Sequence, residues 1–185
     1  IATEISNTAP PERKGENPAI GAIAGIVAKL RASFDEGATR SLDWRLRQLD
    51  GVSRFVEECH DDILDALAKD LGKPNFEGFL TEIAYTQTEI GHMRKHLSSW
   101  MKPERVSTPM VAQPGTSRIH KDPLGVVLNI APWNYPFQLA IGPALGAIAA
   151  GNCVIIKPSE VAANTSKLLA ERLPKYVDQS CIQVV

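Results

Sequence analysis

The chain has 185 residues, 44% of them hydrophobic, and a formal net charge of -1 at pH 7. A nearly neutral chain offers no electrostatic attraction to nucleic acid, so we expect no nucleic-acid partner. No apolar run is long enough to cross a bilayer, and the first residues lack the basic-then-apolar pattern of a secretory signal.

Helical patterns dominate the first 105 residues. Residues 1–19 are rich in Thr, Ser, Pro, Glu and Asn, and we expect them to form a mobile arm. After this arm, apolar side chains recur at helical spacing. Gly37 and Gly72 are placed to end helices, and Ser41 is placed to cap one. The pattern predicts four helices, over residues 20–34, 42–56, 61–71 and 76–100.

Each of these helices carries apolar positions at helical spacing, which normally face a protein core. In the first helix one face holds Ile23, Ile26, Val27, Leu30 and Phe34. In the fourth helix the expected packing positions are Phe79, Ile83, Tyr85, Ile90, Met93 and Leu97.

The composition changes at residues 106–122, which are rich in Thr, Ser, Val, Gln, Pro and Gly. Weak alternation around Pro114 predicts a ribbon of two edge strands, because proline is excluded from central strands. A two-stranded ribbon is not stable alone. We therefore expect residues 106–122 to pack on another subunit or on a part of the protein outside this chain.

The last third of the chain alternates strands and helices. Apolar runs at 125–130 and 153–156 predict two buried strands, joined by a helix over 137–150. This βαβ unit predicts a parallel sheet and an α/β fold. A helix over 161–176 and a strand from residue 182 continue the pattern. Because the alternation stops in mid-pattern, we expect the chain to be the front portion of a larger α/β protein.

Polar residues follow each of the two strands. Trp133 and Asn134 come after the first strand, and Lys157, Ser159 and Glu160 come after the second. Ligands of open parallel sheets bind just beyond the carboxyl ends of the strands. The sequence therefore places a candidate ligand site at this edge.

Each group also has a simpler interpretation that the residues alone leave open. Asn134 stands between prolines and could be a turn residue that bonds its local backbone. Lys157 and Glu160, three residues apart, could be an ordinary surface ion pair.

The cysteines and histidines show no pattern of a disulfide framework or a metal site. Cys59, Cys153 and Cys181 are odd in number and form no CxxC or Cys/His cluster, so we expect reduced structural thiols. His92 and His96 are four residues apart, but no acidic residue in the sequence completes a metal site with them. We predict no metal.

Four segments, in this order, resemble the aldehyde dehydrogenase family. They are Pro-Leu-Gly-Val-Val at 123–127, Pro-Trp-Asn-Tyr-Pro at 132–136, Gly-Ala-Ile-Ala-Ala-Gly-Asn at 146–152 and Lys-Pro-Ser-Glu at 157–160. The last three are similar to the class 3 branch, which acts on fatty and aromatic aldehydes, and residues 173–185 resemble its plant-type members. The resemblance covers the chain from about Ile23 onward.

The resemblance implies an NAD(P)-dependent enzyme that oxidises an aldehyde to a carboxylic acid through a cysteine thiohemiacetal and a thioester. It assigns Asn134 as the catalytic donor to the oxyanion, and Lys157 and Glu160 as ligands of the adenosine ribose. NAD is favoured, with NADP as the alternative, because Glu160 repels a 2′-phosphate. The implied cofactor-binding residues are Ile130, Ala131, Pro132, Trp133, Lys157, Ser159 and Glu160.

The implied fold is an incomplete aldehyde dehydrogenase fold, with residues 20–105 and 123–185 in a Rossmann-like cofactor domain. Residues 106–122 would be an oligomerisation ribbon, so the implied partner is a second copy in a homodimer. The cysteine nucleophile and the carboxylate base would lie C-terminal to Val185, in a catalytic domain absent from this chain. None of the three cysteines present matches the nucleophile motif.

Two rival interpretations stay open, as does the location in the cell. The first rival is a truncated, non-catalytic fragment that binds nucleotide or only an interaction partner, and the second is a relative that acts on semialdehydes. We expect a cytoplasmic protein, with an organelle, including a plastid, as the alternative. Some relatives carry a C-terminal membrane anchor, which would lie outside these residues.

Overall fold

The computed structural model describes residues 18–185, with side chains described from residue 21. The arm expected at 1–19 lies outside the described residues except for its last two, which begin the first helix. The N-terminal half consists of helices α1 Pro18–Asp35, α2 Leu42–Glu58, α3 His60–Leu71, α4 Asn75–Gly78 and α5 Tyr85–Trp100, with a π-helical turn η1 Phe79–Ala84 between the last two. The C-terminal half consists of strands β1 Glu104–Val106, β2 Ser117–Ile119, β3 Val126–Ile130, β4 Cys153–Lys157 and β5 Ile182–Val184, helices α6 Gln138–Ala150 and α7 Ala163–Arg172, and short 3-10 turns at Met110–Ala112 and Leu173–Lys175.

The residues predicted to cap or end helices are confirmed, although the predicted helices over 42–56 and 161–176 extend over Leu42–Glu58 and Ala163–Arg172 in the structure. The Ser41 hydroxyl accepts a hydrogen bond from the backbone N–H of Trp44 at 3.1 Å and so caps α2. Gly37 and Gly72 have φ of 83° and 67°, a left-handed conformation that ends α1 and α3. The predicted helix over 76–100 is interrupted by the π-helical turn at Phe79–Ala84, which periodicity did not indicate.

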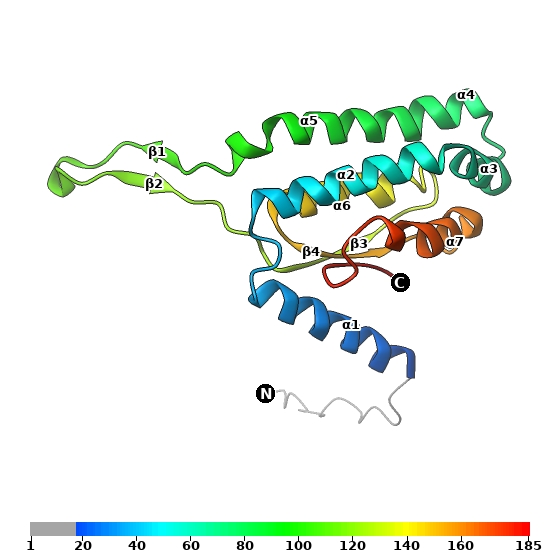
Figure 1. Ribbon diagram of the computed structural model, residues 1–185, viewed down its shortest axis with the longest axis horizontal. Coiled ribbons are helices and arrows are strands. Elements are labelled where there is room, and N and C mark those ends of the chain that lie inside the picture. Colours follow the sequence, from blue (N-terminus) through cyan, green and yellow to red (C-terminus); the bar gives the residue numbers. More distant parts are fainter. Residues whose placement is uncertain (1–17) are drawn as a thin grey trace, which may run out of the picture.

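Strands β3, β4 and β5 form a parallel sheet in the order β3-β4-β5, with helices on both faces. Figure 1 shows α2 and α6 stacked over this sheet, α5 above them and α1 on the opposite side. The predicted βαβ unit is therefore confirmed. The carboxyl ends of β3 and β4 point toward α3, α4 and α7, at the right of Figure 1.

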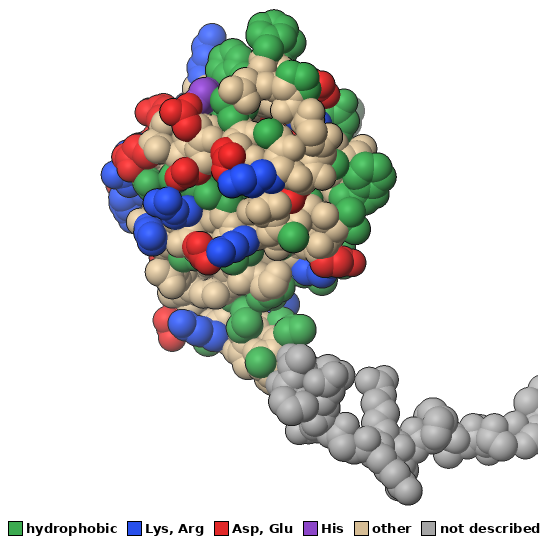
Figure 2. All heavy atoms as spheres, turned by 90° about the vertical axis from the view of Figure 1, so that its right-hand side faces the viewer, with side chains coloured by type: hydrophobic (Ala, Val, Ile, Leu, Met, Phe, Trp, Pro, Cys, Tyr) green, Lys and Arg blue, Asp and Glu red, His purple; other side chains and the backbone are tan. Residues whose placement is uncertain are grey.

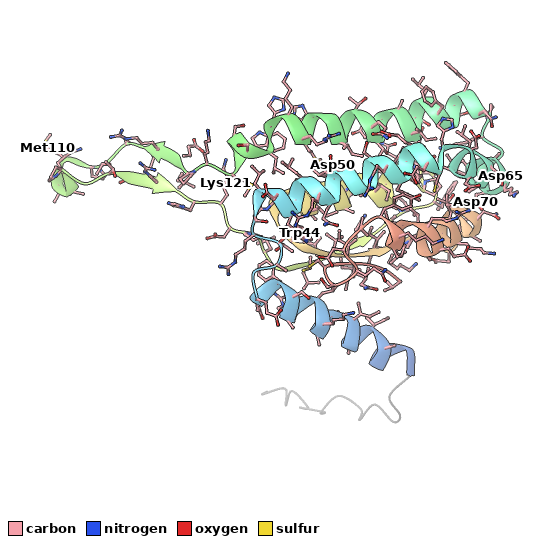
Figure 3. All side chains as sticks on the ribbon, in the orientation of Figure 1. Trp44, Asp50, Asp65, Asp70, Met110 and Lys121 are labelled. Carbon is pink, nitrogen blue, oxygen red and sulfur yellow. The ribbon has the colours of Figure 1, made fainter. Side chains whose placement is uncertain are left out.

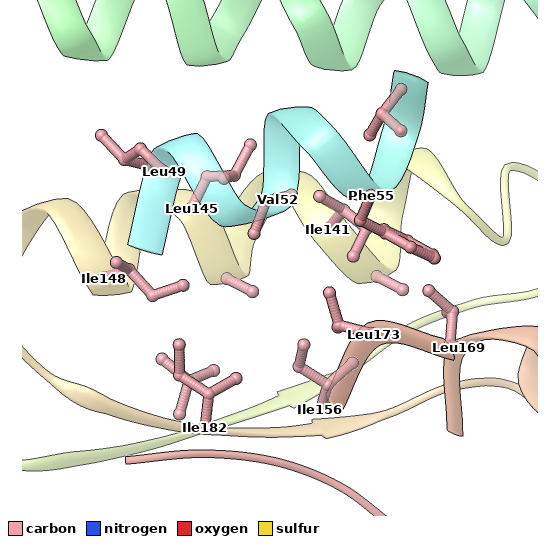
Figure 4. Packing of buried hydrophobic residues seen from close by; sticks show 14 of the residues in the cluster. Leu49, Val52, Phe55, Ile141, Leu145, Ile148, Ile156, Leu169, Leu173 and Ile182 are labelled. Atoms are coloured by element: carbon pink, nitrogen blue, oxygen red, sulfur yellow. The ribbon is translucent and has the colours of Figure 1, made fainter. Parts of the chain in front are cut away.

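The core lies between α2, α6 and the sheet, as Figure 4 shows. Each buried Leu, Ile or Phe contributes about 1.5–3 kcal/mol relative to an exposed side chain. The labelled residues of this cluster are Leu49, Val52, Phe55, Ile141, Leu145, Ile148, Ile156, Leu169, Leu173 and Ile182.

Several apolar side chains expected in the core are exposed instead. In α1 Leu30 is buried, but Ile23 and Val27 are exposed, because only part of that helix face rests on β3 and β4. Phe79 and Tyr85 are also exposed. The remaining packing positions, Ile83, Ile90, Met93 and Leu97, are buried or partly buried against the core.

Strand β3 is likewise not the buried strand that its apolar run predicted. Leu128 and Ile130 are 57% and 66% exposed. Strand β3 is the edge of the described sheet, and α1 covers only part of its outer face. An apolar run shows that a face is suited to burial, but it does not show that a neighbour covers it.

Asn129, on the inner face of β3, explains how α6 tolerates a proline. Pro143 lies inside α6 and has no N–H to give to the carbonyl four residues earlier, that of Leu139. The buried Asn129 amide donates to the Leu139 carbonyl at 3.3 Å and to the Ala140 carbonyl at 2.8 Å. This strand side chain therefore satisfies the carbonyl that the proline leaves unpaired.

The start of α7 is held by a carboxylate from another helix. One oxygen of Asp70 accepts from the N–H of Asn164 at 2.9 Å, and the other accepts from the N–H of Thr165 at 2.7 Å. These donors have no partner within α7, and negative charge is favoured at a helix N-terminus. Burial alone would raise the pKa of Asp70, but the hydrogen bonds from Thr165 and Asn164 outweigh it and lower the pKa.

This contact predicts a pH-dependent stability. Because the folded-state pKa of Asp70 is lower than the unfolded value of about 3.9, its contribution is present above pH 4 and is lost as the pH falls through the folded pKa. At pH 7, Asp70→Asn should reduce the free energy of unfolding by about 1 kcal/mol, the usual worth of a cap. Urea titrations should show this difference shrinking below pH 4.

The matched control is Asp65→Asn, because the exposed Asp65 carboxylate pairs only with Lys69 on the same helix. That substitution should change stability by no more than about 0.5 kcal/mol. A difference between wild type and Asp70→Asn that stays constant from pH 7 to pH 3 would contradict the assignment of Asp70.

Strands β1 and β2 form the predicted antiparallel ribbon, with Glu104 opposite Ile119 and Val106 opposite Ser117. The paired residues span 104–119 rather than 106–122. Figure 1 shows the ribbon extending away from the helical body. Met110, labelled at its tip in Figure 3, is 91% exposed, and Val111 is 96% exposed. Among the described helices, none is both long and apolar enough to cross a membrane.

Candidate functional site

The turns that follow β3 and β4 lie side by side. Ile130 and Lys157 are partners at the ends of the two strands, and the N–H of Ala131 donates to the carbonyl of Lys157 at 2.9 Å. The polar groups after each strand therefore occupy the same edge of the sheet, as the sequence predicted.

The first turn is anchored at both ends and exposed in its middle. Ala131 and Phe137 are 4% and 0% exposed, and the Phe137 ring packs against Phe55 at 6.0 Å between centroids. Between these anchors, Trp133 is 53% exposed and Asn134 is also exposed. Asn134 is thus an exposed residue on a segment whose two ends are fixed.

A buried carboxylate holds the C-terminal end of this turn. Glu82, in η1, is 0% exposed, and one of its oxygens accepts from the N–H groups of Phe137 and Gln138 at 2.9 and 3.0 Å. Its other oxygen pairs with Lys73. The Lys73 ammonium also lies 4.0 Å from the centre of the Tyr135 ring.

Sequence reasoning missed both Glu82 and Lys73. The sequence did contain a signal, because Glu82 precedes Thr86 and Ile90 at intervals of four residues and so places an acid on the packing face of the helix. In the structure all three residues are buried. A charged residue is seldom fully buried unless it is paired.

The second turn carries an exposed ion pair between Lys157 and Glu160. The hydrogen bond from Lys157 holds the pKa of Glu160 below its usual range, so the carboxylate is ionised at neutral pH. Ser159 is buried, and its hydroxyl accepts from the N–H of Val161 at 3.3 Å. An ammonium and a carboxylate at one edge can donate to and accept from a pair of hydroxyl groups.

The other residues predicted for the cofactor differ in accessibility. Ile130 is exposed, so its side chain is open to a ligand. Pro132 is exposed beside Trp133. Ala131 is buried, and its N–H is already bonded to β4, so it can contribute only its carbonyl or its shape.

The three thiols do not contribute to this edge as nucleophiles. Cys59, Cys153 and Cys181 are all buried and unpaired by disulfides. A hydrogen bond with the Cys181 thiol and burial both raise the pKa of Cys153, which keeps it neutral. The prediction of structural thiols agrees with this burial. Within residues 18–185 there is no cluster of three metal-ligating side chains.

Figure 2 views the molecule from the side at which the carboxyl ends of β3 and β4 point. Positive and negative side chains are mixed across this face, with hydrophobic side chains gathered toward its top and right. A cavity of about 290 Å³ lies elsewhere, lined by residues such as Met93, Trp100 and Ala150 at the far end of α5 and α6. The candidate site is therefore an exposed edge rather than an enclosed pocket.

A family model described as "Aldehyde dehydrogenase family" matches residues 21–185. The chain is 48% identical over 163 residues to "Aldehyde dehydrogenase family 3 member B1" of Bos taurus, which covers 88% of this chain and 35% of that protein. It is 44% identical over 160 residues to "Aldehyde dehydrogenase family 3 member I1, chloroplastic" of Arabidopsis thaliana, covering 86% and 29%.

Among solved structures, the substrate-bound state of Staphylococcus aureus AldH matches with a TM-score of 0.86 and 40% identity. That match covers 88% of this chain and 36% of the solved chain. The chain thus spans about a third of the length of the curated relatives it matches.

Proposed function

Because the chain belongs to the aldehyde dehydrogenase family, we propose that the whole protein oxidises an aldehyde to a carboxylic acid with a nicotinamide cofactor. The family resemblance and the incomplete form of the fold, both expected from the four motifs, are confirmed by the match over residues 21–185. The observation that carries the proposal is the placement of Asn134 and the Lys157–Glu160 pair at one edge of the sheet.

Asn134 is proposed as the donor that stabilises negative charge on the aldehyde oxygen. In the proposed reaction a cysteine from outside this chain would attack the carbonyl carbon to form a thiohemiacetal. Loss of a hydride to the nicotinamide cofactor would then leave a thioester, which water would hydrolyse to the carboxylic acid. The exposed amide of Asn134, on a turn fixed at both ends, is suited to donate a hydrogen bond to the oxygen as charge develops.

Lys157 and Glu160 are proposed to hold the cofactor through its adenosine ribose. When bound, the nicotinamide group accepts a hydride from the substrate. The Glu160 carboxylate can accept from a ribose hydroxyl and the Lys157 ammonium can donate to one. These two side chains can reach a ribose because both are exposed, and the exposed Ile130 side chain beside them can make an apolar contact with the cofactor. The proposed cofactor contacts at the same edge also include Trp133, Pro132, Ala131 and Ser159, and the buried Ser159 would contribute by fixing its turn.

Glu160→Gln is expected to weaken NAD binding and to favour NADP relative to NAD. The substitution removes the ionised acceptor, and losing a hydrogen bond to a charged group corresponds to about a tenfold change in the dissociation constant. It also removes the charge that repels a 2′-phosphate. Calorimetric titration of the whole protein with NAD and NADP measures both effects.

The control is Glu171→Gln, the same chemical change in an exposed carboxylate on α7 that pairs with Lys167 at 3.9 Å. This variant should bind both cofactors like wild type. Unchanged NAD and NADP affinities in Glu160→Gln would remove Glu160 from the cofactor site and leave the surface ion pair as its only role.

The ribbon of residues 104–119 is proposed to join two copies of the protein as a homodimer. A free two-stranded ribbon has two unpaired edges and too little packing to be stable alone. The exposure of Met110 and Val111 at its tip leaves apolar surface for a partner to cover. A second copy of the same chain can pair its own ribbon or sheet with this surface.

The direct test is an assay of NADH formation from aldehyde and NAD by the purified natural protein, together with its intact mass. Turnover by a polypeptide heavier than the 20.1 kDa of these residues is the expected result. A species near 20.1 kDa without turnover would support the alternative, a non-catalytic fragment that binds nucleotide or a partner. We propose a cytoplasmic location, with an organelle as the alternative because one relative is named chloroplastic.

A further inference from the structure

We propose that Glu82 and Lys73 are positioning residues that fix the turn carrying Asn134 in its catalytic geometry. This inference rests on the proposed role of Asn134 as the oxyanion donor. Neither residue is near the turn in sequence, since Glu82 and Phe137 are separated by 55 residues.

Glu82 holds the turn through its backbone. The first N–H groups of a helix have no partner inside the helix. At the start of α6 the N–H groups of Phe137 and Gln138 donate to one oxygen of Glu82 at 2.9 and 3.0 Å. Phe137 comes three residues after Asn134, so a shift of the Glu82 carboxylate would move the peptide groups next to the proposed donor.

Lys73 contacts both the carboxylate and the turn. Its ammonium pairs with the second oxygen of Glu82, and the two side chains are only 8% and 0% exposed. The same ammonium lies 4.0 Å from the centre of the ring of Tyr135, the residue after Asn134, a favourable cation–π distance. The part of the turn C-terminal to Asn134 is therefore held both through its backbone and through an aromatic side chain.

Two features of this arrangement favour a geometric role over a purely stabilising one. A buried ion pair usually contributes little net stability, and an apolar replacement is often as stable. Glu82 also lies in the π-helical turn Phe79–Ala84, which shifts the register of the helix locally. Such π-helical turns occur frequently at functional sites. Here the π-helical turn lies where the Glu82 carboxylate meets the N-terminus of α6.

The test is Glu82→Gln in the full-length protein. Glutamine keeps the length of the side chain and one acceptor but removes the ion pair with Lys73. A displacement of about 1 Å remote from the chemistry can reduce rates by as much as about 10²-fold. We therefore expect kcat per folded active site to fall by roughly 10- to 10²-fold, while KM for NAD stays within about twofold, because Lys157 and Glu160 are on the other turn.

A double-mutant cycle separates positioning from general stability. If Glu82 acts through Asn134, Glu82→Gln should lower kcat much less in an Asn134→Ala background than in wild type. Glu171→Gln is the matched control and should leave kcat unchanged. Lys73→Arg retains the charge but changes the donor geometry, so it should give a smaller fall in kcat, and it serves as the test if Glu82→Gln does not fold.

The outcomes distinguish this inference from the function on which it rests. If Asn134→Ala leaves kcat unchanged, the oxyanion role itself is wrong. If Asn134→Ala is impaired but Glu82→Gln and Lys73→Arg keep wild-type kcat and lose only thermal stability, the pair is structural and the positioning role is refuted. Equal, additive effects of Glu82→Gln in both backgrounds would also overturn it.

Discussion

Replacing Asn134 by alanine in the full-length protein is expected to lower kcat by about 10²–10³-fold, the usual effect of removing one oxyanion donor. In its proposed role the amide donates to an oxygen that gains charge only as the reaction proceeds, so its loss should affect the transition state more than the bound substrate. Affinity for NAD should change little, because Lys157 and Glu160 belong to the turn after β4. Steady-state kinetics with a saturating cofactor measures kcat, and calorimetry measures NAD binding.

Two variants complete this experiment. Asn134→Asp has nearly the same shape but replaces the N–H donor with an ionised acceptor, so it should be at least as impaired as the alanine variant. Asn75→Ala, at an exposed position in α4, is the matched control and should behave like wild type. Wild-type kcat in Asn134→Ala would show that the asparagine is a turn residue without a catalytic role.

Gly51→Ala is the substitution from which we expect the largest loss of stability. Gly51 is buried within α2, and a Cβ placed there would lie 2.1 Å from the backbone carbonyl oxygen of Tyr176 and 3.2 Å from its carbon. A backbone group cannot move aside without displacing the segment that leads into β5. Overpacking of this kind typically costs about 1–3 kcal/mol, and the short distance to backbone places Gly51 at or above the upper end. Urea-induced unfolding of the full-length protein measures the change.

The same substitution at Gly91 should act in the opposite direction. Gly91 lies in α5, where a Cβ would meet no atom within 4 Å. Because glycine in a helix interior is less favourable than alanine by about 0.5–1 kcal/mol, Gly91→Ala should raise the free energy of unfolding by that amount. A stabilised Gly51→Ala protein would mean that α2 and the Tyr176 segment are not in close contact.

Gly51→Ala would also test how the Tyr176 segment supports the turn that carries Asn134. Tyr176 packs its ring against Phe55 at 5.6 Å between centroids, and Phe55 in turn contacts Phe137. A displacement of the Tyr176 segment would therefore be transmitted to the C-terminal anchor of the turn that carries Asn134. We therefore expect Gly51→Ala to lower kcat as well as stability, whereas Gly91→Ala should leave kcat unchanged.

Features encoded by neighbouring residues could be predicted from the sequence alone. Ser41, Gly37 and Gly72 mark helix ends because capping and left-handed turns depend on the local backbone. The alternation of apolar runs and helical patterns predicts the parallel βαβ unit, whose carboxyl ends must share one edge. The ordered motifs around Asn134 and Lys157 indicate the family for the same reason, since each motif is a short contiguous segment.

Other features were decided by contacts between residues far apart in the chain. Glu82 meets Phe137, Asn129 compensates for Pro143 inside α6, and Gly51 faces Tyr176, and no local pattern identifies such partners. Exposure was likewise undetermined by sequence, because the apolar run of β3 does not reveal which elements cover its two faces. The sequence by itself determined the elements, their order and the edge that carries the polar groups. Only the tertiary structure decided what holds those groups in place, because a buried carboxylate gains its role from the donors that folding brings to it.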